Sequence, residues 1–476
     1  MEVSEDAEHD ATGLAELVAA GEVDTAEVHA AARQAVEQVD GELNAVVGEL
    51  FDQPLAAAES GPFAGVPFAI KDLLLHAEGV PQRAGSRLFG AGIPFPYDTA
   101  LMRRFRAAGL SAMGLTTTPE FGFNASTASV AYGTTRNPWD TSRSPGGSSG
   151  GSAALVAARA LPAAHANEGG GSIRIPAAAC GLVGLKPSRG RVTVAPDYAE
   201  LLLGLGVEFA VTRTVRDAAA LLDAVHGAEL CDRYLLPDPA SSFLAAARPP
   251  SATLRIAVST AAPNGVPVDP ACVAAVQAAA EALAGAGHVV EYAAPAFDIA
   301  AFDDANFNVW CSFLADAAYG AAAALGVDLS TDVLESTTLA CATYGASLTA
   351  LDLYAADRVF NATTRTLAAF LTDHDVWLTP TTAAPSSAIG HLDADDATLD
   401  ARGWYDKIFG FAPFTAWSNV AGTPAVSVPG VPSPAGCPVG VQLVGRYAAE
   451  ETLLGLAALL EEAMPWAQRR PKVMAH

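Results

Sequence analysis

Short apolar runs that alternate with stretches of helical periodicity constrain this chain more than any other feature. The apolar runs at 66–70 and 110–115 have the length of buried strands, whereas 26–39 and 98–109 place apolar residues at helical spacing. A strand that is apolar on both faces needs cover on both faces, and helices that follow strands along the chain supply it. The sequence therefore predicts an α/β fold with a central mixed, largely parallel β-sheet covered by helices on both faces.

The same patterns predict further elements. Helices are expected throughout 10–60, over 153–160, and in the alanine-rich middle of the chain near 270–286, 311–325 and 347–370. Strands are expected at 255–258, 375–378, 419–429 and 438–445. Because no repeat or linker divides the chain, we expect a single domain over residues 1–476, with the most distinctive motifs at about 61–192 and a variable helical region at about 225–410.

Charge and composition restrict the class of partner. The chain of 476 residues carries 27 Lys and Arg against 52 Asp and Glu, a formal charge of −25. Nucleic acids and anionic membranes bind clustered positive charge, so neither is an expected partner. No apolar run approaches the length of about 18 residues that a membrane span needs. The first ten residues, MEVSEDAEHD, are too acidic for a secretory or mitochondrial leader, so we expect a cytoplasmic location.

Neither a disulfide framework nor a metal site is expected. The cysteines are far apart and form no C-x-x-C pair, and the histidines form no H-E-x-x-H motif. This spacing is typical of reduced cytosolic thiols. The cysteines are Cys180, Cys231, Cys272, Cys311, Cys341 and Cys437.

Two glycine- and serine-rich clusters, at 144–152 and 168–176, are the strongest functional signal. Such runs can be flexible linkers, but both lie between apolar segments that predict ordered structure. Glycine there allows backbone amides to turn toward a ligand. Neither cluster matches a phosphate-binding loop, because G-x-x-x-x-G-K-[ST] is absent and no G-x-G-x-x-G follows an expected strand.

The first cluster also satisfies G-x-S-x-G, the nucleophile elbow of α/β-hydrolases, at Ser148 and at Ser149. That motif requires a strand that leads directly into the turn and a histidine near the end of the chain. The residues before the cluster are expected to form a loop, and neither His374 nor His391 has a distinctive setting. We therefore do not expect an elbow.

Eight motifs in a consistent order resemble those of the amidase signature hydrolases. The resemblance is close over about 61–192 and looser over nearly the whole chain. The motifs lie at 65–72, 116–121, 136–139, 145–152, 170–177, 180–187, 422–429 and 438–445.

The resemblance implies a catalytic triad of Ser172 as nucleophile, Ser148 as bridging serine and Lys71 as base. It also implies a cis peptide bond between Gly147 and Ser148, with Ser149 supporting that turn. The backbone amides at 169–171, those of Gly169, Gly170 and Gly171, would then form the oxyanion hole. The expected activity is hydrolysis of an amide C–N bond through an acyl-enzyme.

The chemistry of these residue types agrees with the implied roles. A serine hydroxyl needs an adjacent base, and a lysine can be that base only when its amine is neutral. Burial disfavours the charged amine, and Lys71 ends an apolar run. The alternative is a lysine that extends from a strand end into water. Asp72 would oppose the pKa shift, but successive side chains of a strand point to opposite faces, so we expect it to point away.

The chain departs from the family pattern just before the nucleophile. Members usually carry Gly-Thr and then, four residues before the nucleophilic serine, Asp; here Ala166, Asn167 and Glu168 occupy these positions. We expect Glu168 to pair with Arg174 and to hold the loop from both sides of Ser172. Asn167 and Glu168 are therefore predicted to support the site, together with Ser149 and Arg174.

The expected substrate is a small neutral or zwitterionic amide, linear or cyclic, and no cofactor is expected. Aromatic residues gather at 306–313 and 404–417. Two positions stay open for Cys311: it faces an acyl pocket, or it packs in the core, as buried free cysteines more often do. Two other functions stay open: a glutamine-hydrolysing amidotransferase subunit and a non-catalytic subunit that binds a partner. The sequence is also compatible with a homodimer.

Overall fold

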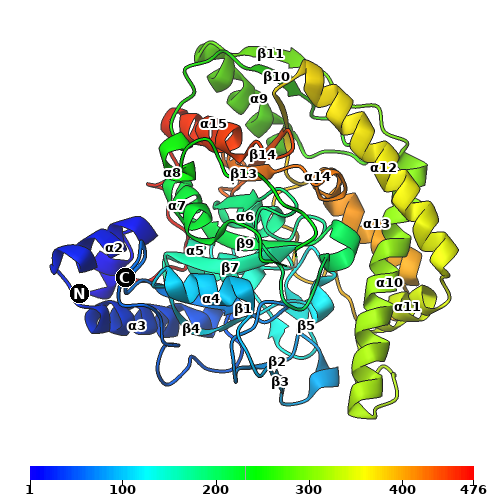
Figure 1. The fold of residues 1–476 in the computed structure, drawn as a ribbon, viewed down its shortest axis with the longest axis horizontal. Helices are drawn as coiled ribbons and strands as arrows, with labels where there is room; N and C mark the ends of the chain where they lie inside the picture. The colour runs from blue at the N-terminus through cyan, green and yellow to red at the C-terminus, as the bar shows by residue number, and fades with distance from the viewer. Residues whose placement is uncertain (231) are drawn as a thin grey trace.

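An eight-stranded mixed sheet forms the centre of the computed structural model, which describes residues 1–230 and 232–476 (Figure 1). The strand order across the sheet is β11-β10-β12-β14-β13-β8-β9-β7. In chain order these strands are β7 (Ala163–Glu168), β8 (Val183–Lys186), β9 (Val207–Thr212), β10 (Arg255–Val258), β11 (Val289–Tyr292), β12 (Val376–Pro380), β13 (Ala425–Pro429) and β14 (Gly440–Gly445).

The α/β class and the mixed sheet are confirmed, but the expectation of a largely parallel sheet is wrong. Only the pairs of β10 with β11 and with β12 are parallel; the other five pairs in this sheet are antiparallel. The reason lies in the connections. A parallel neighbour needs a crossover such as α9 (Pro270–Gly285), which joins β10 to β11, whereas the short loop from β13 to β14 can join only antiparallel strands.

Three two-stranded sheets complete the β-structure of the described residues. The parallel pair β1 (Pro67–Lys71) and β4 (Ser111–Thr116) is the important one, because β1 ends at the predicted base. The other two are antiparallel pairs of short strands: β2 (Pro81–Gln82) with β3 (Ile93–Pro94), and β5 (Ala128–Ser129) with β6 (Gly133–Thr134).

Helices cover both faces of the large sheet. A Cβ added at Gly440 would meet Ala178 of α6 (Arg174–Cys180), and one added at Gly445 would meet Leu453 of α15 (Glu450–Ala463). Residues an odd number of positions apart in a strand point to opposite faces, so α6 and α15 lie on opposite sides of β14. The helices α10 (Ile299–Leu325), α11 (Ser336–Ala346), α12 (Ala350–Asp373) and α13 (Ala401–Phe411) form a separate layer at one side of the molecule (Figure 1).

The remaining helices lie outside that layer. They are α1 (Val3–Asp6), α2 (Ala11–Ala20), α3 (Thr25–Leu43), α4 (Ala100–Ala107), α5 (Gly150–Ala157), α7 (Val215–Val225), α8 (Phe243–Ala246) and α14 (Ala416–Ala421), with 3-10 turns η1 (Arg87–Phe89), η2 (Glu120–Gly122) and η3 (Leu201–Gly204).

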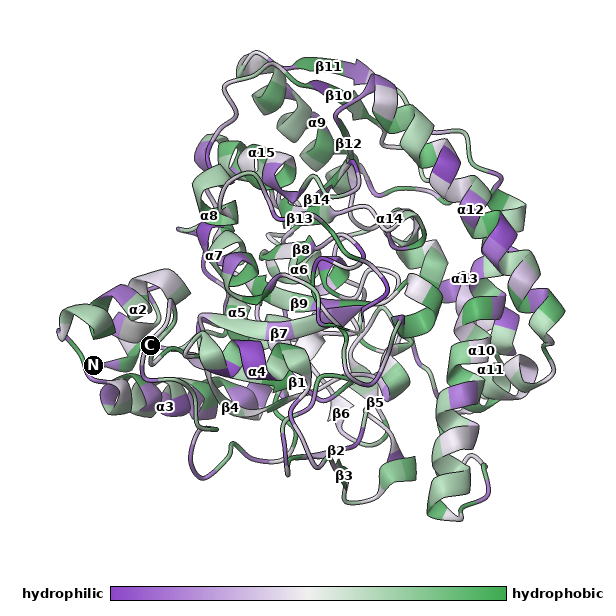
Figure 2. Ribbon diagram, in the orientation of Figure 1, coloured by the Kyte–Doolittle hydropathy of each residue, from purple (hydrophilic) through white to green (hydrophobic). Residues whose placement is uncertain are grey.

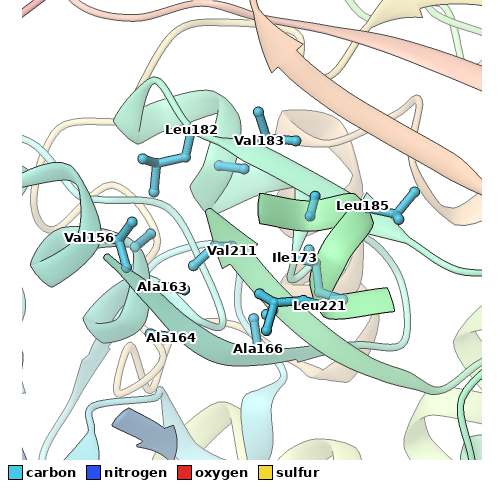
Figure 3. Close-up of a cluster of buried hydrophobic side chains, with 14 of the residues drawn as sticks. Val156, Ala163, Ala164, Ala166, Ile173, Leu182, Val183, Leu185, Val211 and Leu221 are labelled. Atoms are coloured by element: carbon cyan, nitrogen blue, oxygen red, sulfur yellow. The ribbon is translucent and has the colours of Figure 1, made fainter. Parts of the chain in front are cut away.

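The hydrophobic core surrounds helix α5, which follows the first glycine-rich cluster, and strand β7, which leads into the second. Figure 3 shows Val156 of α5, Ala164 and Ala166 of β7, Leu185 of β8 and Val211 of β9 packed together. All five are fully buried. This buried packing holds the loops at both ends of α5 and α6.

Helix α12 differs from these buried elements. It alternates hydrophilic and hydrophobic residues along its length, as expected for a helix with one exposed face (Figure 2).

Four local predictions differ from the structure. The helix expected near 311–325 begins already at Ile299, as α10. The helical run from residue 10 ends at Leu43; Val47, Phe51 and Leu55 instead donate backbone hydrogen bonds to carbonyls of residues 112–115, along β4. Helix α5 begins at Gly150 rather than at residue 153, inside the glycine-rich cluster. The strand expected from residue 419 begins only at 425, because α14 occupies 416–421.

Two observations on the described residues concern membrane-spanning helices and cysteines. No described helix is both long enough and apolar enough to cross a membrane. The five cysteines within the described residues are buried free thiols, and Cys231 lies outside the described residues. The single domain over 1–476 stays a prediction.

Candidate active site

The Lys71 side chain is fully buried at the end of β1 and contacts Ser148 of the first glycine-rich cluster and Asn167, the residue just before the second cluster. Its Nζ donates to Ser148 Oγ at 2.7 Å and to Asn167 Oδ1 at 2.6 Å, while its backbone N–H donates to His165 Nδ1 at 3.2 Å. The strand thus places the amine between the serine loop and β7. This contact excludes the alternative of a lysine that extends into water.

The electrostatic environment of Lys71 favours a neutral amine. Burial lowers the pKa of Lys71 to about 7, and the carboxylates of Glu208 and Glu168 oppose that shift. Asp72 does not contribute: its carboxylate accepts hydrogen bonds from the backbone of Arg83 and from the hydroxyl of Tyr132. The expectation that Asp72 points away from the lysine is confirmed.

The first glycine-rich cluster forms the tight turn that carries Ser148. The peptide bond between Gly147 and Ser148 is cis, as the resemblance implies. Ser149 is the residue just before helix α5, and its hydroxyl donates to the backbone oxygen of Asn167 at 3.2 Å. Ser149 thereby links this turn to the end of β7, which agrees with its predicted supporting position.

Ser172 lies on the loop between β7 and α6, next to the first cluster. The backbone N–H of Ser149 donates to the backbone oxygen of Ser172 at 3.3 Å, so the two loops are in direct contact. Gly171 has a φ of 140°, and a Cβ at this position would approach the hydroxyl of Thr415 to 2.5 Å. That hydroxyl donates to the backbone oxygen of Gly170. Glycine at 171 is therefore required both by conformation and by space.

Two small cavities meet at Ser172. The first is lined by Ser148 and Ser172 together with Asn167, Glu168, Gly169 and the apolar side chains of Leu73, Leu74, Phe121, Leu201, Leu202, Trp310 and Phe313. The second is lined by Ser172, Gly170 and the side chains of Phe123, Asn124, Ala125, Ile175, Trp310, Ile408, Phe409 and Ala412. Trp310 and Ser172 border both cavities, so a bound molecule in either one would lie beside the serine.

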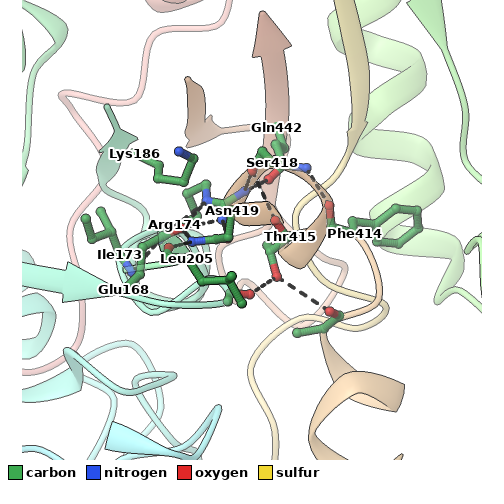
Figure 4. A network of polar contacts seen from close by, with 12 residues as sticks. Glu168, Ile173, Arg174, Lys186, Leu205, Phe414, Thr415, Ser418, Asn419 and Gln442 are labelled. Atoms are coloured by element: carbon green, nitrogen blue, oxygen red, sulfur yellow. Dashed lines mark hydrogen bonds and ion pairs between the residues drawn. The ribbon is translucent and has the colours of Figure 1, made fainter. Parts of the chain in front are cut away.

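Glu168 and Arg174 form a buried ion pair, as predicted from the sequence (Figure 4). Arg174 Nε lies 3.1 Å from both carboxylate oxygens, and Glu168 Oε2 also accepts from the backbone of Ile173 at 3.1 Å. Burial alone would raise the pKa of Glu168, but the charge and hydrogen bonds of Arg174 hold it below its ordinary value. The longer acid is thus accommodated, and the pair connects the residues on either side of Ser172.

Three residues from distant parts of the chain complete this network. Arg174 donates to Ser418 Oγ at 2.7 Å, to Gln442 Oε1 at 2.6 Å and to Asn419 Oδ1 at 2.6 Å (Figure 4). The sequence reasoning did not find them. A polar residue inside an otherwise apolar strand, such as Gln442 in β14, is the one signal that could have indicated a buried partner.

A second buried acid lies behind Lys71. Glu208 on β9 accepts from the side chain of Asn167 at 3.1 Å and from the backbone of Leu75 at 3.2 Å. Burial raises the pKa of Glu208 to about 7, which these hydrogen bonds oppose. Asn167 therefore contacts both the lysine amine and the carboxylate of Glu208. The sequence reasoning did not find Glu208, although an acidic residue inside the apolar strand β9 was an available signal.

Of the two positions left open for Cys311, the structure shows the core position, and the candidate position facing an acyl pocket is wrong. Cys311 lines neither cavity at Ser172 and is fully buried beside Cys341. The contact with the Cys341 thiol, together with burial, raises the pKa of Cys311. Trp310 and Phe313 line the first cavity. Residues three apart share a face of a helix, whereas the residue after Trp310 is rotated by about 100°. Helix α10 consequently turns its aromatic side chains, and not the thiol, toward the serine.

No group of three or more histidine, cysteine or acidic side chains within residues 1–230 and 232–476 is arranged to hold a metal ion. The described residues that gather around Ser172 contribute the hydroxyl of Ser148, the amine of Lys71 and the Glu168–Arg174 ion pair.

Comparison with known proteins identifies the family. The amidase family model matches residues 27–454. The chain is 37% identical to the 6-aminohexanoate-cyclic-dimer hydrolase of Paenarthrobacter ureafaciens, over 98% of this chain and 97% of the relative. A solved structure of 6-aminohexanoate cyclic dimer hydrolase superimposes with a TM-score of 0.92 at 35% identity, covering 98% of this chain and 99% of the other. A complex of such an enzyme with substrate gives 0.90 at 34% identity, covering 98% and 100%. The chain therefore belongs to the amidase family and is an amide hydrolase.

Proposed function

We propose that this amidase cleaves its substrate through an acyl-enzyme on Ser172, with Lys71 as the base and Ser148 as the group that relays the proton. The observation that carries the proposal is the 2.7 Å contact between Lys71 Nζ and Ser148 Oγ, made by a fully buried amine whose pKa is lowered to about 7. Ser148 and Ser172 border the same cavity. A neutral amine in hydrogen-bond contact with a serine is the arrangement that general base catalysis needs.

The proposed reaction has two halves. Lys71 accepts the proton of Ser148, Ser148 accepts that of Ser172, and the Ser172 oxygen bonds to the amide carbon. Backbone N–H groups at Gly169, Gly170 and Gly171 hold the oxyanion; one such donor is typically worth about 10²–10³ in kcat. The relay then protonates the leaving nitrogen as the C–N bond breaks. Water, deprotonated along the same path, attacks the ester carbon, which releases the carboxylic acid and restores Ser172.

The substrate is proposed to be a 6-aminohexanoate-type amide, cyclic or linear. The names of the relatives support this class, and so does the chemistry of the cavities. Among the described residues that line them, Glu168 alone is ionisable, and its charge is taken up by Arg174. The remaining lining is largely apolar, which suits a chain of methylene groups around an uncharged amide.

The experiment is a substrate panel with matched variants. Purified enzyme is given the 6-aminohexanoate cyclic dimer, the linear dimer, an aryl amide and glutamine, and amine release is measured. We expect turnover of at least one 6-aminohexanoate amide, with Ser172→Ala and Lys71→Met both inactive while folded by circular dichroism. Turnover of glutamine alone would favour the amidotransferase alternative, and an active Ser172→Ala variant would overturn the mechanism.

Assembly and location are separate predictions. The homodimer, with which the sequence is compatible, and the cytoplasmic location both stay predictions, and sedimentation of the purified protein tests the first.

A further inference from the structure

Three buried polar side chains of the large sheet lie beside Lys71, and the proposed mechanism uses none of them. His165 and Asn167 are two residues apart on β7, so they point to the same face, and Asn167 lies directly opposite Glu208 of β9. The backbone N–H of Lys71 donates to His165 Nδ1 at 3.2 Å, and its amine donates to Asn167 Oδ1 at 2.6 Å. The sheet thus presents these polar groups to the strand that ends at Lys71.

The side-chain amide of Asn167 is held in one orientation. Its Nδ2 donates to the backbone oxygen of Leu73 at 2.8 Å and to Glu208 Oε1 at 3.1 Å. A backbone oxygen can only accept, so the NH2 group must face Leu73 and Oδ1 must face Lys71. Because Oδ1 carries no hydrogen, its contact with the lysine amine always uses an N–H of the amine.

Glu208 supports this orientation from the other side of the amide. Its Oε1 also accepts from the backbone N–H of Leu75 at 3.2 Å. Burial, followed by the charge of Lys71, lowers the pKa of His165 well below its ordinary value, so the ring is neutral. Because Nδ1 accepts a hydrogen bond, the ring hydrogen is on Nε2, which lies 3.7 Å from Glu208 Oε1. Glu208 Oε1 therefore faces donors on three sides and stays an acceptor for Asn167.

The contact with Asn167 limits where the lone pair of a neutral lysine amine can act. A charged amine has three N–H donors, whereas the neutral amine has two N–H donors and one lone pair. The contact with Asn167 Oδ1 takes one N–H. The other contact of Nζ is with Ser148 Oγ, at 2.7 Å, and a hydroxyl can donate as well as accept. Of these two contacts, only the one with Ser148 can use the lone pair, which is the contact that proton transfer needs.

Asn167 makes this contact without adding charge. Burial lowers the pKa of Lys71 to about 7, and Glu208 and Glu168 oppose that shift. An acid at position 167 would oppose it further, because a carboxylate beside the amine favours its charged form. An amide accepts the same N–H and leaves the charge balance at Lys71 unchanged.

We propose that Asn167 is a positioning residue of the proton relay: it takes one N–H of Lys71 and so directs the lone pair of the amine to Ser148. Glu208 and the backbone oxygen of Leu73 hold the amide of Asn167 in the orientation that this requires. The inference rests on the proposed acyl-enzyme mechanism, and Asn167 acts in it through the lysine.

The test is the dependence of kcat/KM on pH, from about pH 5 to about pH 10, for an uncharged amide and for variants that are folded by circular dichroism. Asn167→Leu has a similar size but offers no acceptor. Above the pH at which the rate stops rising, the amine is neutral in every variant, so the plateau reports how well the lone pair is directed. The plateau of Asn167→Leu should lie at least about tenfold below that of the wild type, with the loss in kcat and not in KM.

Two further variants separate the acceptor from the charge. Asn167→Asp restores an oxygen that accepts from the amine, so its plateau should lie at least about tenfold above that of Asn167→Leu. Its negative charge should raise the pKa of Lys71 and move the rise in kcat/KM to higher pH by about one unit or more. Glu208→Gln removes a charge but keeps an oxygen to which Asn167 can donate, so the rise should move to lower pH while the plateau stays above that of Asn167→Leu.

Three results would overturn the positioning role. They are a wild-type plateau in Asn167→Leu, a plateau in Asn167→Asp as low as that of Asn167→Leu, and a rise in Asn167→Asp that stays at its wild-type pH. The last result decides even where Asn167→Leu does not fold. Lys71→Met separates this inference from the mechanism on which it rests: turnover by Lys71→Met would overturn the relay itself, whereas an inactive Lys71→Met beside a wild-type plateau in Asn167→Leu would overturn the positioning role alone.

Discussion

The acidic side of the pH–rate profile should report the ionisation of Lys71. Only the neutral amine can accept a proton, and the pKa of Lys71 is lowered by burial from the ordinary 10.5 to about 7. Protonation below this pKa removes the base, so kcat/KM should rise with pH and then level off. The neutral fraction is about 0.09 at pH 6, about 0.5 at pH 7 and about 0.91 at pH 8, which predicts a rise of about tenfold between pH 6 and pH 8.

The measurement uses an uncharged amide, so that the substrate itself does not titrate, at substrate concentrations well below KM and at constant ionic strength. Under these conditions kcat/KM reports groups of the free enzyme. A profile that is flat between pH 6 and pH 8 would refute the assigned role of the lysine. So would a rate that still rises about tenfold per pH unit above pH 9, because that is the behaviour of an unshifted amine.

Glu208 provides the control, since burial raises its pKa to about 7 as well. Its negative charge raises the pKa of Lys71, so Glu208→Gln should lower that pKa and move the rise in kcat/KM to lower pH. If Glu208 were the titrating group instead, the same variant would abolish the rise. The two assignments are thereby distinguished by one substitution.

Other parts of the site give separate predictions. Glu168→Ala leaves the buried Arg174 without its carboxylate and should lower the free energy of unfolding by about 3–5 kcal/mol in urea denaturation; unchanged stability and turnover would remove the pair from the mechanism. Trp310→Ala should raise KM about tenfold or more, whereas Cys311→Ala should leave KM unchanged; a reversed pattern would contradict the orientation of α10. Gly171→Ala should destabilise the loop by about 1–3 kcal/mol and lower kcat, because a Cβ there meets a threonine hydroxyl; wild-type kinetics would argue against the oxyanion assignment.

Contacts between neighbouring motifs could be predicted from the sequence because they depend on local patterns. The apolar run before Lys71 predicts a buried strand end, and the strand alternation predicts that Asp72 turns away; both hold in the structure. The pairing of Glu168 with Arg174 spans only six residues and follows from two opposite charges on one short loop.

Contacts between distant segments could not be predicted in the same way. Asn419 and Gln442 reach Arg174 only because α14 and β14 pack beside α6, and no local pattern indicates that packing. The antiparallel order of the sheet depends likewise on how the last strands return to it. For Cys311, the sequence located the correct helix but could not determine its rotation about its own axis.

Intact-mass spectrometry of the enzyme quenched during turnover tests the proposed mechanism most directly. We expect a transient mass increase equal to the acyl part of the amide, located by peptide mapping on Ser172 and absent from Ser172→Ala. Lys71→Met should suppress its formation without unfolding the protein. An acyl group on a different residue, or full turnover by Ser172→Ala, would contradict the mechanism.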